Sequence, residues 1–299
     1  MNNTTKRTLT PWLKTRWIWL TLFSLLAFAA NSVLCRLALK GEGVDPETFT
    51  ALRLLSGCAA LAFLLRCKTG SLKPGGSWKG SVALFLYAYL FSIAYVQLEA
   101  GVGALVLFGA VQLTMFAASW WAGEALRPRV LLGMGLAFAG LLVLLLPGAS
   151  APPVVSSLMM VVSGMAWGAY SLLGKGSSNA LGDTTGNFLR CLVLLLPLAV
   201  MMAAKGAPHA SPAGVAYALG SGVVASGLGY AAWYSVLKHL SAQQAATLQL
   251  CVPVIASVGG VLLLNEAMTL RLGISSAVVL GGIALALAGR AKLEGPQRS

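Results

Sequence analysis

Residues 123–146 read GEALRPRVLLGMGLAFAGLLVLLL, and residues 265–288 read NEAMTLRLGISSAVVLGGIALALA. In each stretch a glutamate stands five residues before an arginine, and a Gly-rich apolar segment follows. The two glutamates, Glu124 and Glu266, are 142 positions apart, and so are Arg129 and Arg271. Because self-similarity at a fixed distance marks an internal duplication, the chain is predicted to consist of two related halves.

The same correspondence extends through both halves. Further pairs at this spacing are Leu98 and Leu240, Ala104 and Ala246, Gly140 and Gly282, and Leu145 and Leu287. Earlier in each half the spacing shifts to 137 to 139 positions, as small differences in loop length would cause. The pairs there are Arg36 and Lys175, Asp45 and Asp183, and Arg53 and Arg190.

The composition identifies lipid as the solvent. Of the 299 residues 58% are apolar and 10% are charged, whereas an ordinary soluble domain carries about 25% charged residues. Apolar runs of about twenty residues, the length that crosses a bilayer as a helix, follow one another along the chain. Ten spans are predicted, at residues 17–39, 47–66, 79–98, 102–121, 129–147, 154–174, 184–204, 213–237, 243–264 and 270–290.

The basic residues gather at the ends of these spans. They precede the first span, fill the second loop and follow the last span: Lys6, Arg7, Lys14, Arg16; Arg66, Lys68, Lys73, Lys79; Arg290, Lys292, Arg298. The positive-inside rule makes these segments and both termini cytoplasmic. The formal charge of the chain is +13, but its lysines and arginines form no basic stripe with stacking aromatics, so nucleic-acid binding is not expected.

An all-α membrane fold is therefore predicted, with ten transmembrane helices arranged as two inverted five-helix repeats around a central cavity. The expected parts are a cytoplasmic arm (1–16), two repeats (17–148 and 149–290) and a cytoplasmic tail (291–299). An odd number of spans per repeat inverts the second repeat, an arrangement that suits transport by alternating access. The five cysteines show no CxxC spacing, and neither a metal nor a cofactor is expected.

Polar and aromatic side chains within the spans are the candidates for substrate binding, because polar groups in lipid need internal partners. Aromatic stripes also serve helix packing, and this alternative stays open for each aromatic residue. Pro253, which lacks a backbone N–H, is a candidate hinge. The substrate-binding candidates are Asn31, Ser32, Tyr87, Phe91, Tyr95, Gln112, Trp167, Tyr170, Ser171, Tyr230, Trp233, Tyr234 and Gln249.

Charged residues near the span ends are interpreted as structural. Arg53 and Arg190 are expected to extend to the interface or to bond loop carbonyls. Glu124 and Glu266 are expected to pair with the arginines that follow them, Arg129 and Arg271. Glu99, in a short outer turn, is the acid near the mouth of the pore that could titrate.

The repeated block Gly123-Glu124-Ala125 before Arg129, echoed by Asn265-Glu266-Ala267, resembles the EamA-type repeat of the drug/metabolite transporter superfamily. The resemblance covers nearly the whole chain and is greatest to the bacterial YddG amino-acid exporters. It implies a cavity among spans 1, 3, 4, 6, 8 and 9, with spans 2 and 7 at the flanks and spans 5 and 10 at an edge. The small four-span drug exporters of the superfamily carry a glutamate in the middle of their first helix. Here Asn31 and its neighbours are uncharged, so proton-coupled export of cationic drugs is not expected.

The hypothesis from sequence is a carrier in the bacterial inner membrane that exports aromatic or other neutral amino acids, or related small metabolites. A carrier of anionic metabolites, such as sugar phosphates or nucleotide sugars, is the alternative and would require Arg53, Arg190 or Lys175 to face the cavity. An intramembrane enzyme is disfavoured, because the spans hold no HExxH motif and no paired aspartates. The expected partners are a small-molecule substrate and membrane lipid, and the chain is expected to act as a monomer.

Overall fold

A computed structural model describes residues 11–41, 43–123, 128–146, 151–174, 177–205, 209–237 and 248–291. The first predicted half contains α1 (Pro11–Leu39), α2 (Pro46–Thr69), α3 (Trp78–Tyr95), α4 (Ala100–Trp121) and α5 (Pro128–Leu145). The second contains α6 (Val154–Gly174), α7 (Ala180–Lys205), a rod of α8 (Pro212–Gly220), η1 (Ser221–Leu228) and α9 (Gly229–Leu237), then α11 (Cys251–Leu264) and α12 (Leu270–Ala291).

Eight of these described segments are long and apolar enough to cross a membrane, and the continuous α8–η1–α9 rod is one of them. The α3 helix is not one of the eight; it has Lys79 in its first turn and contains three tyrosines, and α11 has only 14 residues. Large apolar side chains such as Leu196, Val200 and Leu262 lie exposed on the outside. A surface of this kind fits hydrocarbon rather than water, so the protein is a multi-pass membrane protein.

Local sequence explains where several helices begin and end. Asp45 caps α2 by accepting the Thr48 backbone N–H, and Pro46 follows at the first helical position, where a proline is tolerated. Gly70 ends α2 with φ 72°, a conformation that suits glycine. Ser77 and Ser211 cap α3 and α8 in the same way as Asp45 caps α2.

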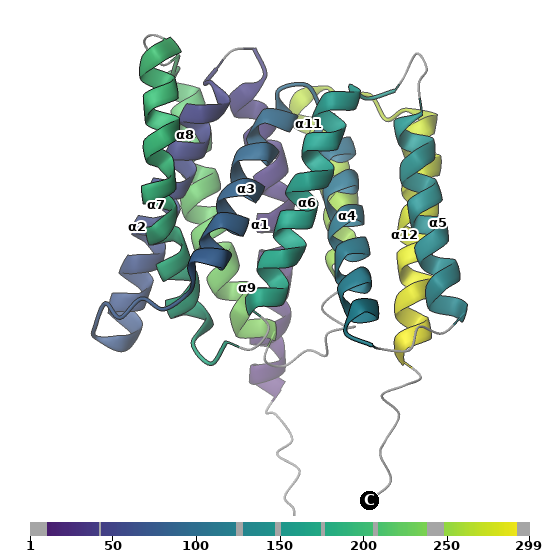
Figure 1. Ribbon diagram of the computed structural model, residues 1–299, viewed down its shortest axis with the longest axis horizontal. Helices are drawn as coiled ribbons and strands as arrows, with labels where there is room; N and C mark the ends of the chain where they lie inside the picture. Colours follow the sequence, from purple (N-terminus) through teal and green to yellow (C-terminus); the bar gives the residue numbers. More distant parts are fainter. Residues whose placement is uncertain are drawn as a thin grey trace, which may run out of the picture.

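The two halves are interleaved rather than side by side. The α3 and α4 helices pack on α6, α2 packs on η1 and α7, and α1 and α4 pack on α11. The α5 and α12 helices form a separate pair at one edge, on the right in Figure 1. Small residues bring this pair together, because a Cβ atom on Gly133 would lie 2.5 Å from the Gly282 carbonyl oxygen.

The bundle has two ends. The α1 helix begins and α12 finishes at the same end, the bottom of Figure 1, where α2 also ends and α3 begins. This end carries Arg66, Lys68, Lys73 and Lys79, and we call it the basic end. The turns between α3 and α4 and between α11 and α12 lie at the opposite end, the top of the same view.

Candidate functional site

A central cavity lies between the two halves at mid-depth of the bundle. Its volume is about 20 Å³, which is room for one water molecule. Asn31 and Tyr87 stand eight residues from the ends of α1 and α3, about 12 Å into the bundle from the opposite end. The lining side chains come from α1, α3, α4, α6, η1 and α9: Phe28, Asn31, Ser32, Tyr87, Phe91, Leu107, Phe108, Trp167, Ala225 and Tyr230.

Aromatic rings form the wall of this cavity. The Trp167 ring centroid lies 4.7 Å from that of Tyr87 and 5.1 Å from that of Tyr230. Phe28 meets Tyr230 edge to face at 6.0 Å, and Phe91 lies 5.5 Å from Tyr87. Separations of this size are those at which aromatic rings attract each other. The wall therefore joins α1, α3, α6 and α9 from the two halves.

A chain of buried hydrogen bonds runs beside the aromatic wall. The Ser221 hydroxyl donates to Asn31 Oδ1 (2.7 Å), and Asn31 Nδ2 donates to the Tyr87 hydroxyl (3.2 Å). Arg53 Nη2 donates to the same hydroxyl (2.9 Å), and Arg53 Nε donates to Ser226 Oγ (3.1 Å). Four helical segments, α1, α2, α3 and η1, thus meet at one polar cluster.

The predicted position of Arg53 is wrong. Arg53 is only 1% exposed, so it does not extend to the membrane interface. Its recorded hydrogen-bond partners are the hydroxyls of Ser226 and Tyr87 rather than loop carbonyls. The guanidinium carbon lies 5.0 Å from the centre of the Tyr87 ring and 5.1 Å from that of Phe91, within the range of cation–π attraction. The sequence reasoning failed because a long side chain two turns inside a helix can point inward as easily as outward. Arg190, by contrast, does donate to a loop carbonyl, that of Gly75 (2.6 Å).

The serines of the cluster are presented by a π-helical segment. Residues 221–228 form η1 in the middle of the α8–η1–α9 rod, and π-helical turns inside α-helices often occur at functional sites. The widened turn packs on α2 so closely that a Cβ atom on Gly222 would lie 2.5 Å from the Arg53 carbonyl oxygen. Glycine at this position therefore allows η1 to bring Ser226 to Arg53.

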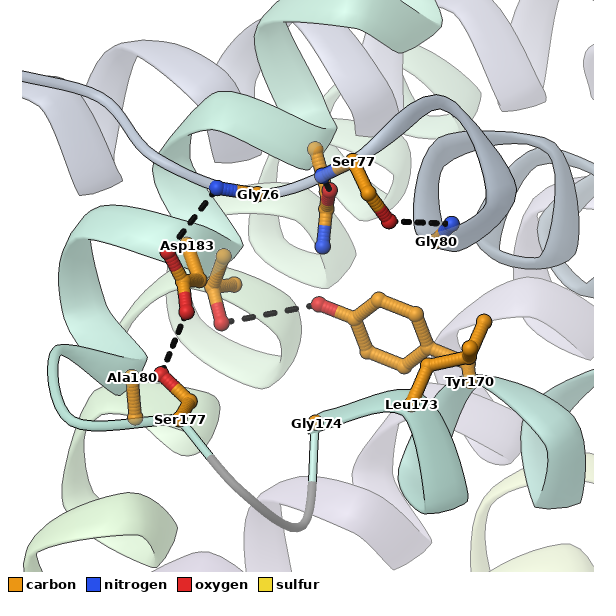
Figure 2. A pocket seen from close by; sticks show the side chains of 11 residues that line it. Gly76, Ser77, Gly80, Tyr170, Leu173, Gly174, Ser177, Ala180 and Asp183 are labelled. Carbon is orange, nitrogen blue, oxygen red and sulfur yellow. Dashed lines mark hydrogen bonds between the residues drawn. The ribbon is translucent and has the colours of Figure 1, made fainter.

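A second, larger pocket opens at the basic end, and Figure 2 shows its walls. Its volume is about 210 Å³, and we call it the vestibule. It is lined by Gly76, Ser77, Gly80, Tyr170, Leu173, Gly174, Ser177, Ala180, Asp183, Thr184 and Asn187. Asp183 accepts from the Gly76 N–H (2.8 Å) and from the Ser177 hydroxyl, and Asn187 Oδ1 accepts from the Ser77 N–H (2.8 Å).

The vestibule and the central cavity share an aromatic boundary. Tyr170 lines the vestibule and reaches the Thr184 hydroxyl at 3.5 Å, while Trp167, one turn away on α6, lines the cavity. Their ring centroids are 5.5 Å apart. The Trp167 side chain therefore stands between the two spaces.

The opposite end is closed by charged groups. Arg36 pairs with Glu266 (3.3 Å) and donates to the carbonyl oxygens of Tyr95 and Val96. The second oxygen of Glu266 accepts from the Ala100 N–H (2.8 Å). The predicted pairing of Glu266 with Arg271 is wrong, since Arg271 donates to the carbonyl oxygens of Val143 and Leu146. Glu124 lies outside the described residues.

Six of the predicted binding residues are brought together at the cavity: Asn31, Ser32, Tyr87, Phe91, Trp167 and Tyr230. The other candidates lie elsewhere. Tyr170 is in the vestibule, Ser171 bonds the Trp167 carbonyl of its own helix, and Tyr95 bonds the Ala100 carbonyl near the opposite end. Trp233 packs edge to face on Phe28 at 5.6 Å, behind the cavity wall.

The remaining candidates belong to α4 and to the segment before α11. Gln112 is buried but is not among the lining residues. Gln249 is half-buried just before α11, and the side chain of Tyr234 is outside the described part of the chain. A turn at Leu250 precedes α11, so Pro253 stands in the first turn of that helix. Pro253 has no backbone N–H to donate to the carbonyl of residue 249, which is consistent with the break in the helix at this point. The hinge role of Pro253 stays a prediction.

Sequence reasoning missed several residues of the site. The sequence pattern assigns Arg53 a structural role and gives no binding role to Ser226, Phe28 or Asn187. The repeat correspondence of Asp45 with Asp183 was the available signal for the vestibule. No comparable signal marks Phe28, because one phenylalanine in an apolar helix resembles any other.

Relatives of known sequence share this chain's length and pattern. An uncharacterized protein of Pseudomonas aeruginosa is 53% identical over 284 residues, which is 94% of this chain and 98% of that protein. An uncharacterized transporter of Archaeoglobus fulgidus is 26% identical over 283 residues, 89% and 95% of the two chains. A probable terminal-alkyne amino-acid exporter of Streptantibioticus cattleyicolor is 25% identical over 250 residues, 79% and 82% of the two chains.

A solved structure and a protein-family model also match this chain. A solved crystal structure with 22% sequence identity superposes with a TM-score of 0.65 over 93% of this chain and 99% of its own, which shows a shared fold. The model of the EamA-like transporter family matches twice, at residues 15–146 and 155–288. With both halves matched, this chain belongs to the EamA-like transporter family.

Proposed function

We propose that this transporter exports amino acids, aromatic or otherwise neutral, or related small metabolites across the bacterial inner membrane by alternating access. The observation that carries the proposal is the central cavity, where Asn31 and two tyrosines offer polar groups among aromatic rings. Apolar walls with a few placed polar groups are typical of sites for small molecules. The amino-acid exporter among the relatives supports the substrate class by its name alone.

The membrane arrangement is part of this proposal. The α3 and α11 segments complete ten spans, and two inverted repeats, 17–148 and 149–290, enclose the cavity. Supporting this, α1 begins and α12 finishes at the basic end, as an even number of crossings requires. The cluster of lysines and arginines at that end makes it the cytoplasmic side, with both termini there.

The two ends of the bundle differ in a way that suits an inward-open or nearly occluded state. The vestibule of 210 Å³ faces the cytoplasmic side, whereas the Arg36–Glu266 pair closes the opposite side. A substrate in the vestibule reaches the cavity when Trp167 moves aside, because this ring separates the two spaces. Opening to the outside then requires the Arg36–Glu266 contacts to break while the vestibule closes on the cytoplasmic side.

The test is counterflow in proteoliposomes that contain the purified full-length chain. Liposomes preloaded with unlabelled L-phenylalanine, L-leucine or L-tryptophan should accumulate the labelled amino acid faster than protein-free liposomes. Trp167→Ala should lower this exchange at least tenfold, whereas Trp19→Ala, which alters a side chain 63% exposed on the lipid side, should leave it unchanged. No exchange of any amino acid above the protein-free level would refute the proposal.

A further inference from the structure

Arg53 is a buried cation with unused hydrogen-bond donors. A guanidinium has five N–H donors, and the structure shows acceptors for Nε and Nη2 only. Nη1 is buried and has no hydrogen-bond partner within the described residues. Among the described residues, no carboxylate lies within ion-pair distance of this guanidinium. Because arginine keeps its charge in proteins, a positive charge stands here without a counterion among the described side chains.

Two hydroxyl groups beside Arg53 also have protons to donate. The Tyr87 hydroxyl already accepts from Asn31 Nδ2 and from Arg53 Nη2, so both of its lone pairs are used and its own proton is free to donate. The Tyr230 hydroxyl is buried and has no partner within the described residues. Both tyrosines line the central cavity. A guanidinium and two hydroxyls thus supply donors, and the described residues provide no hydrogen-bond partner for Arg53 Nη1.

The missing acceptor should carry negative charge. A buried, unpaired charge costs several kcal/mol, and an unmet buried donor adds to this cost. An anion with two adjacent oxygens would accept from Arg53 Nη1 on one side and from the tyrosine hydroxyls on the other. Apart from Asn31 and Ser32, the rest of the cavity wall is apolar, and its rings of Phe28, Phe91, Phe108 and Trp167 suit a hydrocarbon or aromatic group attached to that anion.

We propose that Arg53, with the hydroxyls of Tyr87 and Tyr230, binds the carboxylate of the transported substrate. This rests on the proposed function for the chemical class of the substrate, and it adds the residue that recognises it. The small volume of the cavity means that the aromatic side chains move apart when the carboxylate enters. The scarcity of other charge at this depth then favours a substrate with one carboxylate rather than a doubly charged phosphate.

The first experiment uses the wild-type protein and ligands that differ in one group. Affinities of purified full-length protein are measured by microscale thermophoresis for L-phenylalanine, 3-phenylpropionate, which lacks the amine, and 2-phenylethylamine, which lacks the carboxylate. L-Phenylalanine and 3-phenylpropionate should bind, and 2-phenylethylamine should bind at least tenfold more weakly. Equal affinity for 2-phenylethylamine would overturn the proposal.

The second experiment uses variants. Arg53→Gln should weaken binding of 3-phenylpropionate roughly 10- to 100-fold, and Arg53→Lys should lose less, because it keeps the charge but not the fork of donors. Arg271→Gln is the matched control, since Arg271 bonds carbonyl oxygens of α5 and should leave the affinity unchanged. A correctly folded Arg53→Gln protein, judged by its melting temperature and gel-filtration profile, that binds as tightly as wild type would overturn the proposal.

Two further results separate this proposal from its alternatives. If no amino acid is exchanged in proteoliposomes but 3-phenylpropionate still binds in an Arg53-dependent way, the carboxylate site stands and the amino-acid function fails. If chloride, compared with methanesulfonate, raises the melting temperature through Arg53 and no carboxylate competes with it, Arg53 binds a structural anion and the proposal is wrong. Arg53-dependent binding of 3-phosphoglycerate in preference to 3-phenylpropionate would likewise overturn it.

Discussion

The Tyr87 hydroxyl is the acceptor on which two helices depend, because it takes N–H groups from Asn31 on α1 and from Arg53 on α2. Tyr87→Phe leaves both buried donors unmet, and we expect it to lower the free energy of unfolding by about 1–3 kcal/mol. Tyr230→Phe removes a hydroxyl that has no partner among the described residues and should change stability little. Melting temperatures in detergent check this, and equal losses in the two variants would contradict it.

Glu99 titrates at the opposite end of the bundle. Partial burial raises the pKa of its carboxyl, and the nearby Glu266 adds to this against the opposing effects of Arg36 and Lys40. An acid with a raised pKa in the folded state binds its proton more tightly than in the unfolded chain, so this contribution to stability is full at low pH and is lost as pH rises. From pH 8 to pH 5, the melting temperature of wild type should therefore rise relative to that of Glu99→Gln. A parallel pH dependence in the two proteins would refute this.

At the scale of elements, the contact between η1 and α2 depends on a missing side chain. A Cβ atom on Gly222 would lie 1.9 Å from Ser56 Oγ and 2.5 Å from the Arg53 carbonyl oxygen, and the backbone oxygen cannot move away alone. Gly222→Ala should therefore separate η1 from α2, break the Arg53–Ser226 bond and lower exchange at least tenfold. Gly220→Ala is the control two residues earlier, where the nearest atom is 3.7 Å away. Equal transport by the two variants would exclude this role for Gly222.

The α5–α12 pair is held by close backbone approach. A Cβ atom on Gly133 would lie 2.5 Å from both the Ala286 nitrogen and the Gly282 oxygen, whereas nothing lies within 4 Å of one on Gly135. Gly133→Leu should separate the pair and lower the melting temperature by several degrees, because interhelical packing stabilises membrane helices at such sites. Gly135→Leu should not. Fluorescence-detected gel filtration after heating compares the two, and an identical profile would show that the close approach contributes nothing.

For the whole molecule, alternating access predicts that breaking the contacts that close one end shifts the population toward the conformation open at that end. Glu266→Gln keeps an acceptor for the Ala100 N–H but loses the ion pair with Arg36, so the opposite end should open more often. A cysteine placed at Ser32, which is 1% exposed, in a background without the five native cysteines should then react faster with a membrane-impermeant thiol reagent added from outside. Arg271→Gln, a control at the same end, should leave the rate of this thiol reaction unchanged. An unchanged rate in Glu266→Gln would contradict alternating access.

The sequence alone determined the solvent, the helical class and the internal duplication, because apolar length and repeat spacing are properties of the chain itself. It also picked out Asn31, Tyr87, Trp167 and Tyr230, since polar tips inside apolar spans need internal partners. It could not decide which way a side chain points about its helix axis. Arg53 was therefore predicted at the interface and lies in the core, and Glu266 was assigned to Arg271 and pairs with Arg36. Ser226, which binds Arg53, and Arg36, which binds Glu266, stand 173 and 230 residues from these partners in sequence, and only the packing of helices from both halves brings them into contact.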